Sequence, residues 1–206
     1  MRVFGSGPGV DSPGPRAHNG PVPMERISLK NAGADARRDA VRAAADALRS
    51  GRLIIAPTET VYGLFASADS SDAVAAARRL AKLKPDAPLT WHAPTAAAAL
   101  DLVGPERAVH RRLLEHLLPG PVTFAIEMDA AALGAARDRL SVGVGVLDDN
   151  AALALRVPGD DLCRGILSEA RTTIVGAAAP SASTPIDAPS DRDLSDDVRR
   201  DVALLL

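Results

Sequence analysis

The sequence predicts an α/β fold, in which buried strands alternate with amphipathic helices. Residues 53–56 form an uninterrupted apolar run, which is typical of a strand covered on both faces. Helices with one apolar face are expected on either side of this run, over residues 35–49 and 71–83. The chain has 206 residues and is 47% hydrophobic, so its apolar side chains suffice for the core of one globular domain.

Composition excludes several classes of protein. The net charge of -2 argues against a protein whose whole surface binds nucleic acid, and aromatic residues at 2% are too few for platforms that stack bases. Cys163 is the only cysteine, which excludes an internal disulfide and a cysteine-based metal cluster and fits a reducing compartment. No run reaches the length of a membrane span, so we expect a cytoplasmic protein.

The first segment differs in composition from the rest. Residues 1–24 hold ten Gly and Pro residues and no periodic apolar pattern, so we expect a disordered extension followed by a single domain over residues 25–206. We hypothesise that Met24 is the true start of the protein. Abundant peptides from residues 1–23 in mass spectrometry of the native protein would contradict this.

A polar loop follows the first buried strand. The helix over 35–49 ends at Gly51, and Pro57 ends the strand because proline has no N–H for a ladder. The residues 58–60, Thr-Glu-Thr, therefore lie on a short loop between two apolar segments, where α/β proteins place ligands. An ordinary polar turn between two strands is the alternative interpretation.

The helix over 71–83 begins at a serine and ends in basic residues. Ser70 or Ser71 provides the cap, and Lys82 and Lys84 lie at the other end. Cations at a helix C-terminus are stabilised by about 0.3–1 kcal/mol each, so a solvated helix end explains them without a ligand.

The remaining elements follow in chain order. We expect a strand over 89–92, helices over 94–102 and 105–117, a strand over 122–128, an Ala-rich connector, strands over 141–147 and 152–157, a helix over 160–170, a strand over 172–175, one or two helical turns over 194–200, and the start of a buried strand over 201–206. Pro158 keeps Val157 extended, which leaves Arg156 at the end of its strand and able to reach a cleft. Cys163 is expected to be a small core residue.

Segments spread along the chain resemble one known family. PTETVYGL, which begins at Pro57, resembles the opening signature of the YrdC-like family, the threonylcarbamoyl-AMP synthases. Further resemblances follow in the family's order: KLKPDAPLTWHAP, LPGPVTFAI, an Arg-x-Pro segment at Arg156, and AAAPSAS followed by Pro-Ser at 189–190. Their occurrence together is more specific than any single motif.

The resemblance implies both a fold and a reaction. The fold would be a twisted sheet of mixed strand direction, flanked by helices around a concave, positively lined cavity. The reaction would form threonylcarbamoyl-AMP and pyrophosphate from L-threonine, bicarbonate and ATP, with Mg²⁺, for threonylcarbamoyladenosine in tRNA. No protein nucleophile is required, so catalysis would depend on positioning and charge neutralisation. The implied partners are tRNA or double-stranded RNA and the downstream threonylcarbamoyl transferase machinery.

The resemblance also implies roles for single residues. Threonine would be bound by Arg156 through its carboxylate, together with Thr60, His92 and Ala179. The nucleotide would be bound by Lys82, Lys84, Ser181 and Ser190. No metal ligand from the protein is implied.

Some positions depart from the family's pattern. Lys84 replaces an arginine and therefore offers a point charge instead of a fork for two parallel hydrogen bonds to a phosphate. Ala87 and Ser183 each occupy a position of asparagine. The family also continues with a Gly-rich turn and a Ser-Thr-Val-Val segment, so we expect the domain to be incomplete at its C-terminus. A non-catalytic relative that binds nucleotide or double-stranded RNA, or a truncated product that folds poorly, are the alternatives.

Overall fold

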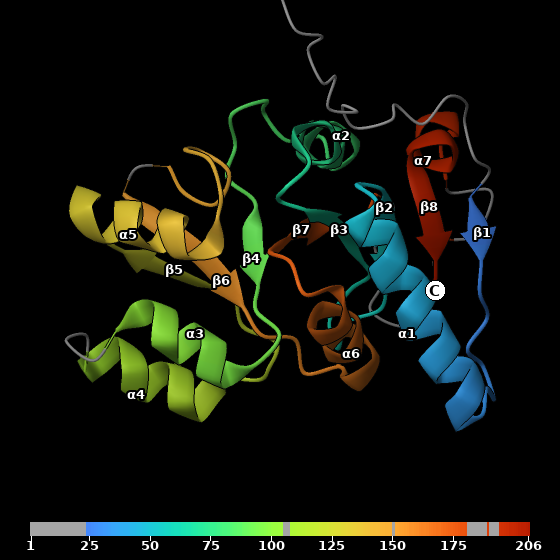
Figure 1. The fold of residues 1–206 in the computed structure, drawn as a ribbon, viewed down its shortest axis with the longest axis horizontal. Helices are drawn as coiled ribbons and strands as arrows, with labels where there is room; N and C mark the ends of the chain where they lie inside the picture. Colours follow the sequence, from blue (N-terminus) through green and yellow to red (C-terminus); the bar gives the residue numbers. More distant parts are fainter. Residues whose placement is uncertain (1–23, 105–107, 150, 181–188, 190–193) are drawn as a thin grey trace, which may run out of the picture.

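A sheet of mixed strand direction runs through the molecule (Figure 1). The computed structural model describes residues 24–104, 108–149, 151–180, 189 and 194–206. Within these residues the sheet has eight strands in the order β1-β8-β2-β3-β7-β4-β6-β5. The strands are β1 (Glu25–Arg26), β2 (Leu53–Ala56), β3 (Gly63–Ser67), β4 (Thr90–His92), β5 (Phe124–Glu127), β6 (Ala152–Arg156), β7 (Ile174–Ala178) and β8 (Val202–Leu205).

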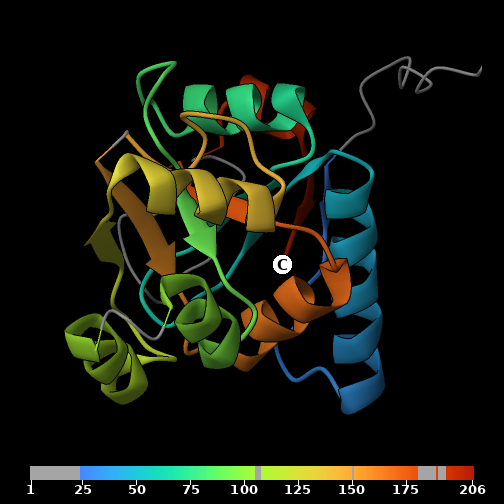
Figure 2. The same cartoon turned by 60° about the vertical axis from the view of Figure 1, so that its left-hand side comes forward.

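Helices cover both faces of this sheet. They are α1 (Ala34–Arg49), α2 (Ser71–Leu80), α3 (Ala96–Val103), α4 (Ala108–Leu117), α5 (Ala130–Leu140), α6 (Asp161–Ala170) and α7 (Asp196–Asp201). One apolar cluster joins α1 and α6 to the face that carries Ile54 and Phe65, and Figure 2 shows these two helices side by side. A larger cluster joins α2, α3 and α5 to the face that carries Ile55 and Leu64.

The strand predicted over residues 53–56 is confirmed. All four residues of β2 are buried, and they alternate between the two apolar clusters, as a strand with helices on both faces requires. β2 pairs antiparallel with β3, so residues 57–62, which include the polar Thr58, Glu59 and Thr60, form the connection between these two strands. That connection is the local setting of the site described below.

The strand expected at the end of the chain also forms. β8 lies between β1 and β2 and runs parallel to both. Its residues are buried, and the N–H of Leu206 donates to the carbonyl of Ile55 at 3.0 Å. The predicted turns before β8 correspond to α7.

The prediction of a strand over 141–147 is wrong. These residues form turns, and Gly145 has a φ of +76°, which does not fit a strand. Arg78 donates from Nε to the carbonyl of Ala87 at 2.7 Å and from Nη2 to that of Gly145 at 2.5 Å. The alternating valines therefore belong to a loop that is anchored by side chains instead of a strand ladder.

Two elements were not anticipated. The Ala-rich connector is the helix α5, which begins at Asp129, whose carboxylate accepts from the N–H of Ala132 at 2.8 Å. β1 is two residues long and consists of charged residues, so it carries no periodic signal. Among the helices of the described residues, none combines the length and the apolar character needed to cross a bilayer.

Candidate functional site

The loop between β2 and β3 is folded by its own hydroxyl groups. The Thr58 hydroxyl donates to the carbonyl of Val61 at 2.6 Å and accepts from the backbone N–H groups of Thr60 and Val61, each at 3.2 Å. Its distance to the Thr60 hydroxyl is 3.1 Å. Because the Thr58 hydroxyl directs its proton to Val61, it does not donate to the Thr60 hydroxyl. The lone pairs of Thr60 therefore remain available to another donor.

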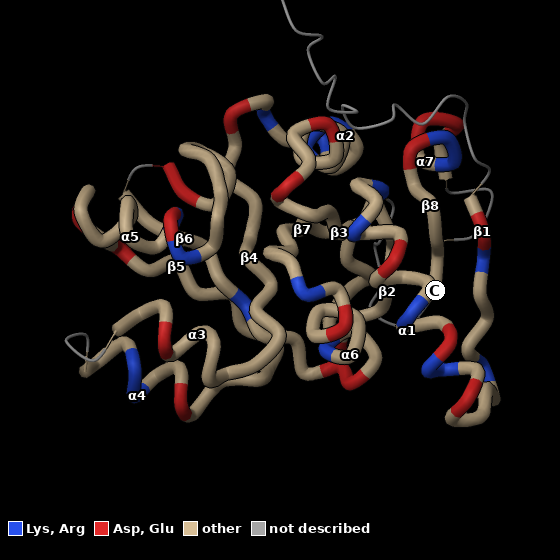
Figure 3. The backbone as a smooth tube through the Cα atoms, viewed as in Figure 1, with Lys and Arg blue, Asp and Glu red and all other residues tan. Residues whose placement is uncertain are grey.

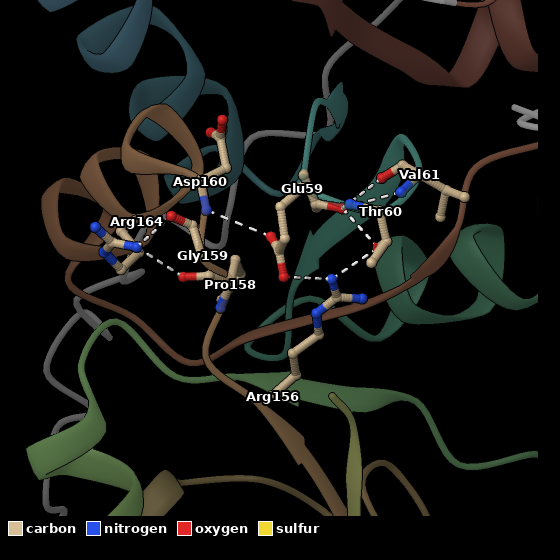
Figure 4. A network of polar contacts seen from close by, with 9 residues as sticks. Glu59, Thr60, Val61, Arg156, Pro158, Gly159, Asp160 and Arg164 are labelled. Atoms are coloured by element: carbon tan, nitrogen blue, oxygen red, sulfur yellow. Dashed lines mark hydrogen bonds and ion pairs between the residues drawn. The ribbon is translucent and has the colours of Figure 1, made fainter. Parts of the chain in front are cut away.

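Arg156 supplies that donor from the end of β6. Its Nη2 donates to the Thr60 hydroxyl at 2.7 Å and to Glu59 Oε1 at 2.8 Å (Figure 4). The Arg156 side chain is 12% exposed, so the guanidinium is largely withdrawn from water. Its Nε is buried and has no hydrogen-bond partner among the described residues. The arrangement leaves donor capacity for a ligand that carries hydrogen-bond acceptors.

Glu59 keeps its negative charge beside this arginine. Partial burial raises the pKa of the Glu59 carboxyl, but the hydrogen bond and the positive charge of Arg156 outweigh it and hold the pKa below its usual value. The carboxylate is therefore ionised at neutral pH.

His92 lies beside Arg156 because β4 and β6 run parallel and pair these two residues. Its Nδ1 lies 3.1 Å from the carbonyl oxygen of Thr90, which makes Nδ1–H the donor and leaves Nε2 as an acceptor. Burial, with a further contribution from the charge of Arg156, lowers the pKa of His92 to about 4. The imidazole is therefore neutral at physiological pH.

The ring of His92 is also fixed by packing. It meets the ring of Phe65 edge to face, with 4.9 Å between the centroids. A Cβ at position 176 would lie 3.1 Å from His92 Cε1 and 2.9 Å from both Phe65 Cδ1 and the carbonyl oxygen of Leu64. Glycine at this position of β7 therefore provides the space for the imidazole.

Thr58, His92 and Arg156 line a cavity of about 220 Å³, which is large enough for an amino acid. The lining residues are Thr58, Val61, Gly63, Thr90, His92, Thr123, Arg156, Ala177 and Ala178. One positive charge, hydroxyl groups and a neutral imidazole in an otherwise apolar wall can bind a small carboxylate with further polar groups.

The structure brings together part of the residue set expected from the sequence. Arg156 and His92 line the cavity, and Thr60, which is not among its lining residues, is hydrogen-bonded to Arg156. Ala179 is buried directly after β7, and its N–H donates to the carbonyl of Tyr62 at 2.8 Å. Ala179 thus ties the end of β7 to the polar loop.

Two of the residues expected to bind the nucleotide lie outside this cavity. Lys82 and Lys84 are exposed and do not line this cavity. Both lysines belong to the segment between α2 and β4, which lies at the top of Figure 1. α6 and the start of α3 lie below the sheet in the same view. Ser181 and Ser190 lie outside the described residues. Figure 3 shows basic and acidic residues mixed along the helices.

Other reactive groups lie away from the cavity. Burial raises the pKa of the Cys163 thiol far above its usual value, in agreement with the predicted core role. Within the described ranges, no group of three His, Cys, Asp or Glu side chains comes together to hold a metal ion.

Glu59 is the site residue to which sequence reasoning gave no role. It was recognised as the carboxylate of the polar loop, but a single glutamate in a loop does not indicate its partner. Its contact with Arg156 joins positions 97 residues apart. The sequence offered one signal for this contact. The opening signature, which contains Glu59, and the Arg-x-Pro segment, which contains Arg156, were both expected at one pocket.

Comparison with known proteins identifies the family of this chain. Residues 46–206 match the family model Sua5_yciO_yrdC, described as telomere recombination. A threonylcarbamoyl-AMP synthase from Bacillus subtilis (strain 168) is 31% identical over 140 residues, which cover 68% of this chain and 37% of that protein. The chain thus spans little more than a third of the length of this curated relative.

Solved structures share the fold. A Sua5 variant from P. abyssi superimposes with a TM-score of 0.67 at 21% identity, covering 88% of this chain and 52% of that one. P. abyssi Sua5 complexed with L-threonine gives a TM-score of 0.61 at 23% identity, covering 82% of this chain and 46% of that one. With the family match extending over residues 46–206, these findings show that the chain belongs to the Sua5/YciO/YrdC family.

Proposed function

We propose that this chain is a nucleotidyltransferase that makes L-threonylcarbamoyladenylate and pyrophosphate from L-threonine, bicarbonate and ATP. The observation that carries the proposal is the cavity lined by Arg156 and neutral His92, with Thr60 hydrogen-bonded to Arg156. The B. subtilis relative named threonylcarbamoyl-AMP synthase and the P. abyssi Sua5 solved with L-threonine support the choice of substrate.

The cavity suits threonine in charge and in hydrogen bonding. Arg156 would pair with the carboxylate, which satisfies donors that the described residues leave unused. His92 presents an acceptor at Nε2, while Thr60 and the backbone around Ala179 complete the amino-acid pocket. A buried, neutral imidazole does not repel the amino group of the ligand.

The chemistry then requires positioning more than a reactive side chain. The threonine nitrogen attacks the carbon of carbon dioxide derived from bicarbonate and gives a carbamate. A carbamate oxygen attacks the α-phosphorus of ATP in line, and the bond from that phosphorus to the pyrophosphate oxygen breaks. An enzyme accelerates such steps by holding the reactants in line and neutralising charge.

We assign the nucleotide side of the reaction to Lys82, Lys84, Ser181 and Ser190, with ATP entering as its magnesium complex. The two lysines would neutralise phosphate oxygens as point charges. The product would pass to the threonylcarbamoyl transferase machinery that modifies tRNA in the cytoplasm. The exposure of both lysines agrees with a ligand that approaches from solvent.

The test is release of pyrophosphate by the purified chain. We expect release that requires threonine, bicarbonate and ATP together and that stops when any one is omitted. Serine in place of threonine provides a matched control, because it lacks only a methyl group. Release that is independent of threonine, or none at all from protein that melts cooperatively, would contradict the proposal.

A further inference from the structure

The Glu59 carboxylate joins two elements that approach the cavity from different directions. Its Oε1 accepts from Arg156 Nη2 at 2.8 Å, and its Oε2 accepts from the backbone N–H of Asp160 at 3.3 Å. Arg156 ends β6, and Asp160 is the N-cap of α6. One side chain therefore links the guanidinium to the beginning of a helix (Figure 4).

The helix end that receives Glu59 is anchored by contacts of its own. Arg164 donates from Nη1 to the carbonyls of Pro158 and Gly159, at 3.0 and 2.6 Å. The Asp160 carboxylate accepts from the N–H of Cys163 at 2.8 Å. Because these bonds do not involve Glu59, the turn at 158–160 is a fixed support for it.

Packing restricts Glu59 as well. A Cβ at position 159 would lie 3.3 Å from both Cγ and Cδ of Glu59, so the side chain rests against the backbone of Gly159. The Glu59 side chain is 23% exposed. With both carboxylate oxygens engaged and one side against the backbone, the carboxylate has a single position available.

These contacts use only one of the two terminal nitrogens of the Arg156 guanidinium. Nη2 is used by Glu59 and Thr60, whereas Nη1 makes no hydrogen bond to a described residue. Figure 4 shows this second terminal nitrogen outside the dashed contacts. Fixing one terminal nitrogen of a planar group fixes the direction of the other, since the guanidinium moves as a unit.

We propose that Glu59 is a positioning residue, which orients Arg156 from the start of α6 so that its second terminal nitrogen meets the carboxylate of the amino-acid substrate. This inference rests on the proposed function for the identity of the substrate. It does not rest on it for the orientation of Arg156. A preoriented guanidinium binds a carboxylate without first losing side-chain freedom.

The bridge requires both the length and the charge of glutamate. Glu59→Asp keeps the charge, but its side chain is one methylene shorter and cannot reach Arg156 and Asp160 together. Glu59→Gln keeps the length, but its amide NH₂ group is a donor and would face either Arg156 Nη2 or the N–H of Asp160, which are donors themselves. Glu115→Gln is the matched control, because Glu115 forms an exposed pair with Arg111 at 3.6 Å on α4.

Kinetics and side-chain NMR test the proposal together. For both Glu59 variants we expect the KM for threonine to rise about tenfold, with the KM for ATP within about twofold of wild type. In spectra of ¹⁵N-labelled arginine side chains, the Arg156 signal should be ordered in wild type and in Glu115→Gln. It should become averaged in both Glu59 variants. Arg156→Lys assigns the signal.

The two readouts separate the two ideas. An Arg156 signal that is unchanged in Glu59→Asp and Glu59→Gln overturns the positioning role, whatever the kinetics show. If the ordered signal is lost in the Glu59 variants, the positioning role is supported even when the wild-type protein releases no pyrophosphate. That second result would contradict only the proposed reaction. If the KM values for threonine and ATP change by the same factor and the melting temperature falls as well, the role of Glu59 is purely structural.

Discussion

Two of the arginine–carboxylate pairs in this domain, Arg137–Asp148 and Arg156–Glu59, are built differently. Arg137 donates from Nε to Asp148 Oδ2 at 2.8 Å and from Nη2 to Asp148 Oδ1, so the pair is bidentate. The Asp148 side chain is fully buried. Arg156 instead shares one nitrogen between Glu59 and Thr60 and keeps a buried Nε without a partner among the described residues.

The difference separates a structural pair from a pair at the proposed binding site, which we call the binding pair. The Arg137–Asp148 pair fastens the turn before β6 to α5, and a fork that meets both carboxylate oxygens gains the most from that contact. The Arg156–Glu59 pair lies beside a cavity and leaves hydrogen-bond capacity unused, which costs free energy in the ligand-free protein. Unused capacity in a buried arginine therefore indicates where a ligand binds.

The largest expected effect comes from breaking the structural pair. Arg137→Ala removes the bidentate arginine from the buried Asp148 carboxylate, so the melting temperature should fall on the order of 10 °C. The KM for threonine, measured well below the melting temperature, should not change. Differential scanning calorimetry and steady-state kinetics measure the two quantities.

The double variant Arg137→Met with Asp148→Leu is the control for that prediction. Removing both charges should restore most of the lost stability, because no buried carboxylate remains unpaired. If Arg137→Ala raises the KM for threonine as strongly as a cavity variant does, the comparison of the two pairs is wrong.

Breaking the binding pair should have the opposite profile. Arg156→Ala removes the cation for the carboxylate, so kcat/KM for threonine should fall about 100-fold or more, while the melting temperature changes little. Arg156→Lys should recover only part of this loss, because an ammonium group cannot reproduce the planar fork. Threonine binding measured by calorimetry would decide the matter, and unchanged affinity in Arg156→Ala would refute the cavity assignment.

His92 makes the binding side sensitive to acid. The pKa of His92 in the folded protein is about 4, below the ordinary value of 6.5. At a pH between these two values, the imidazole is protonated in the unfolded chain but stays neutral in the folded chain. The free energy of unfolding should therefore fall as the pH is lowered from 7 to 5, by about 2 kcal/mol from this group. Glu59 stays ionised over most of this range, since its pKa is lowered.

Urea denaturation at pH 7 and pH 5 measures this effect. His92→Gln should lose this pH dependence, and the other histidines, which remain in both proteins, cancel in the difference. The same slope in both proteins would mean that His92 is protonated as easily in the folded state as in the unfolded state.

The smallest effect is expected from the exposed lysines. The double variant Lys82→Glu and Lys84→Glu should raise the KM for ATP about fivefold, as solvent screening limits the contribution of exposed charges. The affinity for threonine should stay the same. An unchanged KM for ATP at low salt would assign both lysines to a solvated helix end.

Most of the fold was predictable because its elements carry strong local signals. The all-apolar run at 53–56 and the capped helix after Ser70 appear where the sequence places them. The strand predicted over 141–147 failed because alternating valine and glycine imitates a strand, while contacts from Arg78 and Arg137 to distant residues hold a loop. Tertiary contacts of this kind leave no trace in local periodicity.

The site was predictable only in part, and for a related reason. The family resemblance predicted that Thr60, His92 and Arg156 lie at one pocket. The register of β4 and β6 explains why His92 and Arg156 are neighbours. The bridge from Glu59 to Asp160 depends on how α6 begins against the loop at 57–62. No spacing within the sequence encodes that approach.

The place of β8 has a consequence for how the chain assembles. Glu25 and Arg26 of β1 pair with Leu204 and Leu205 of β8, and β2 meets the same strand from the other side. β1 can therefore pair with β8 only after the chain has been synthesised as far as residue 205. Such distant pairing slows folding and leaves the edge of β2 open to other chains in the meantime.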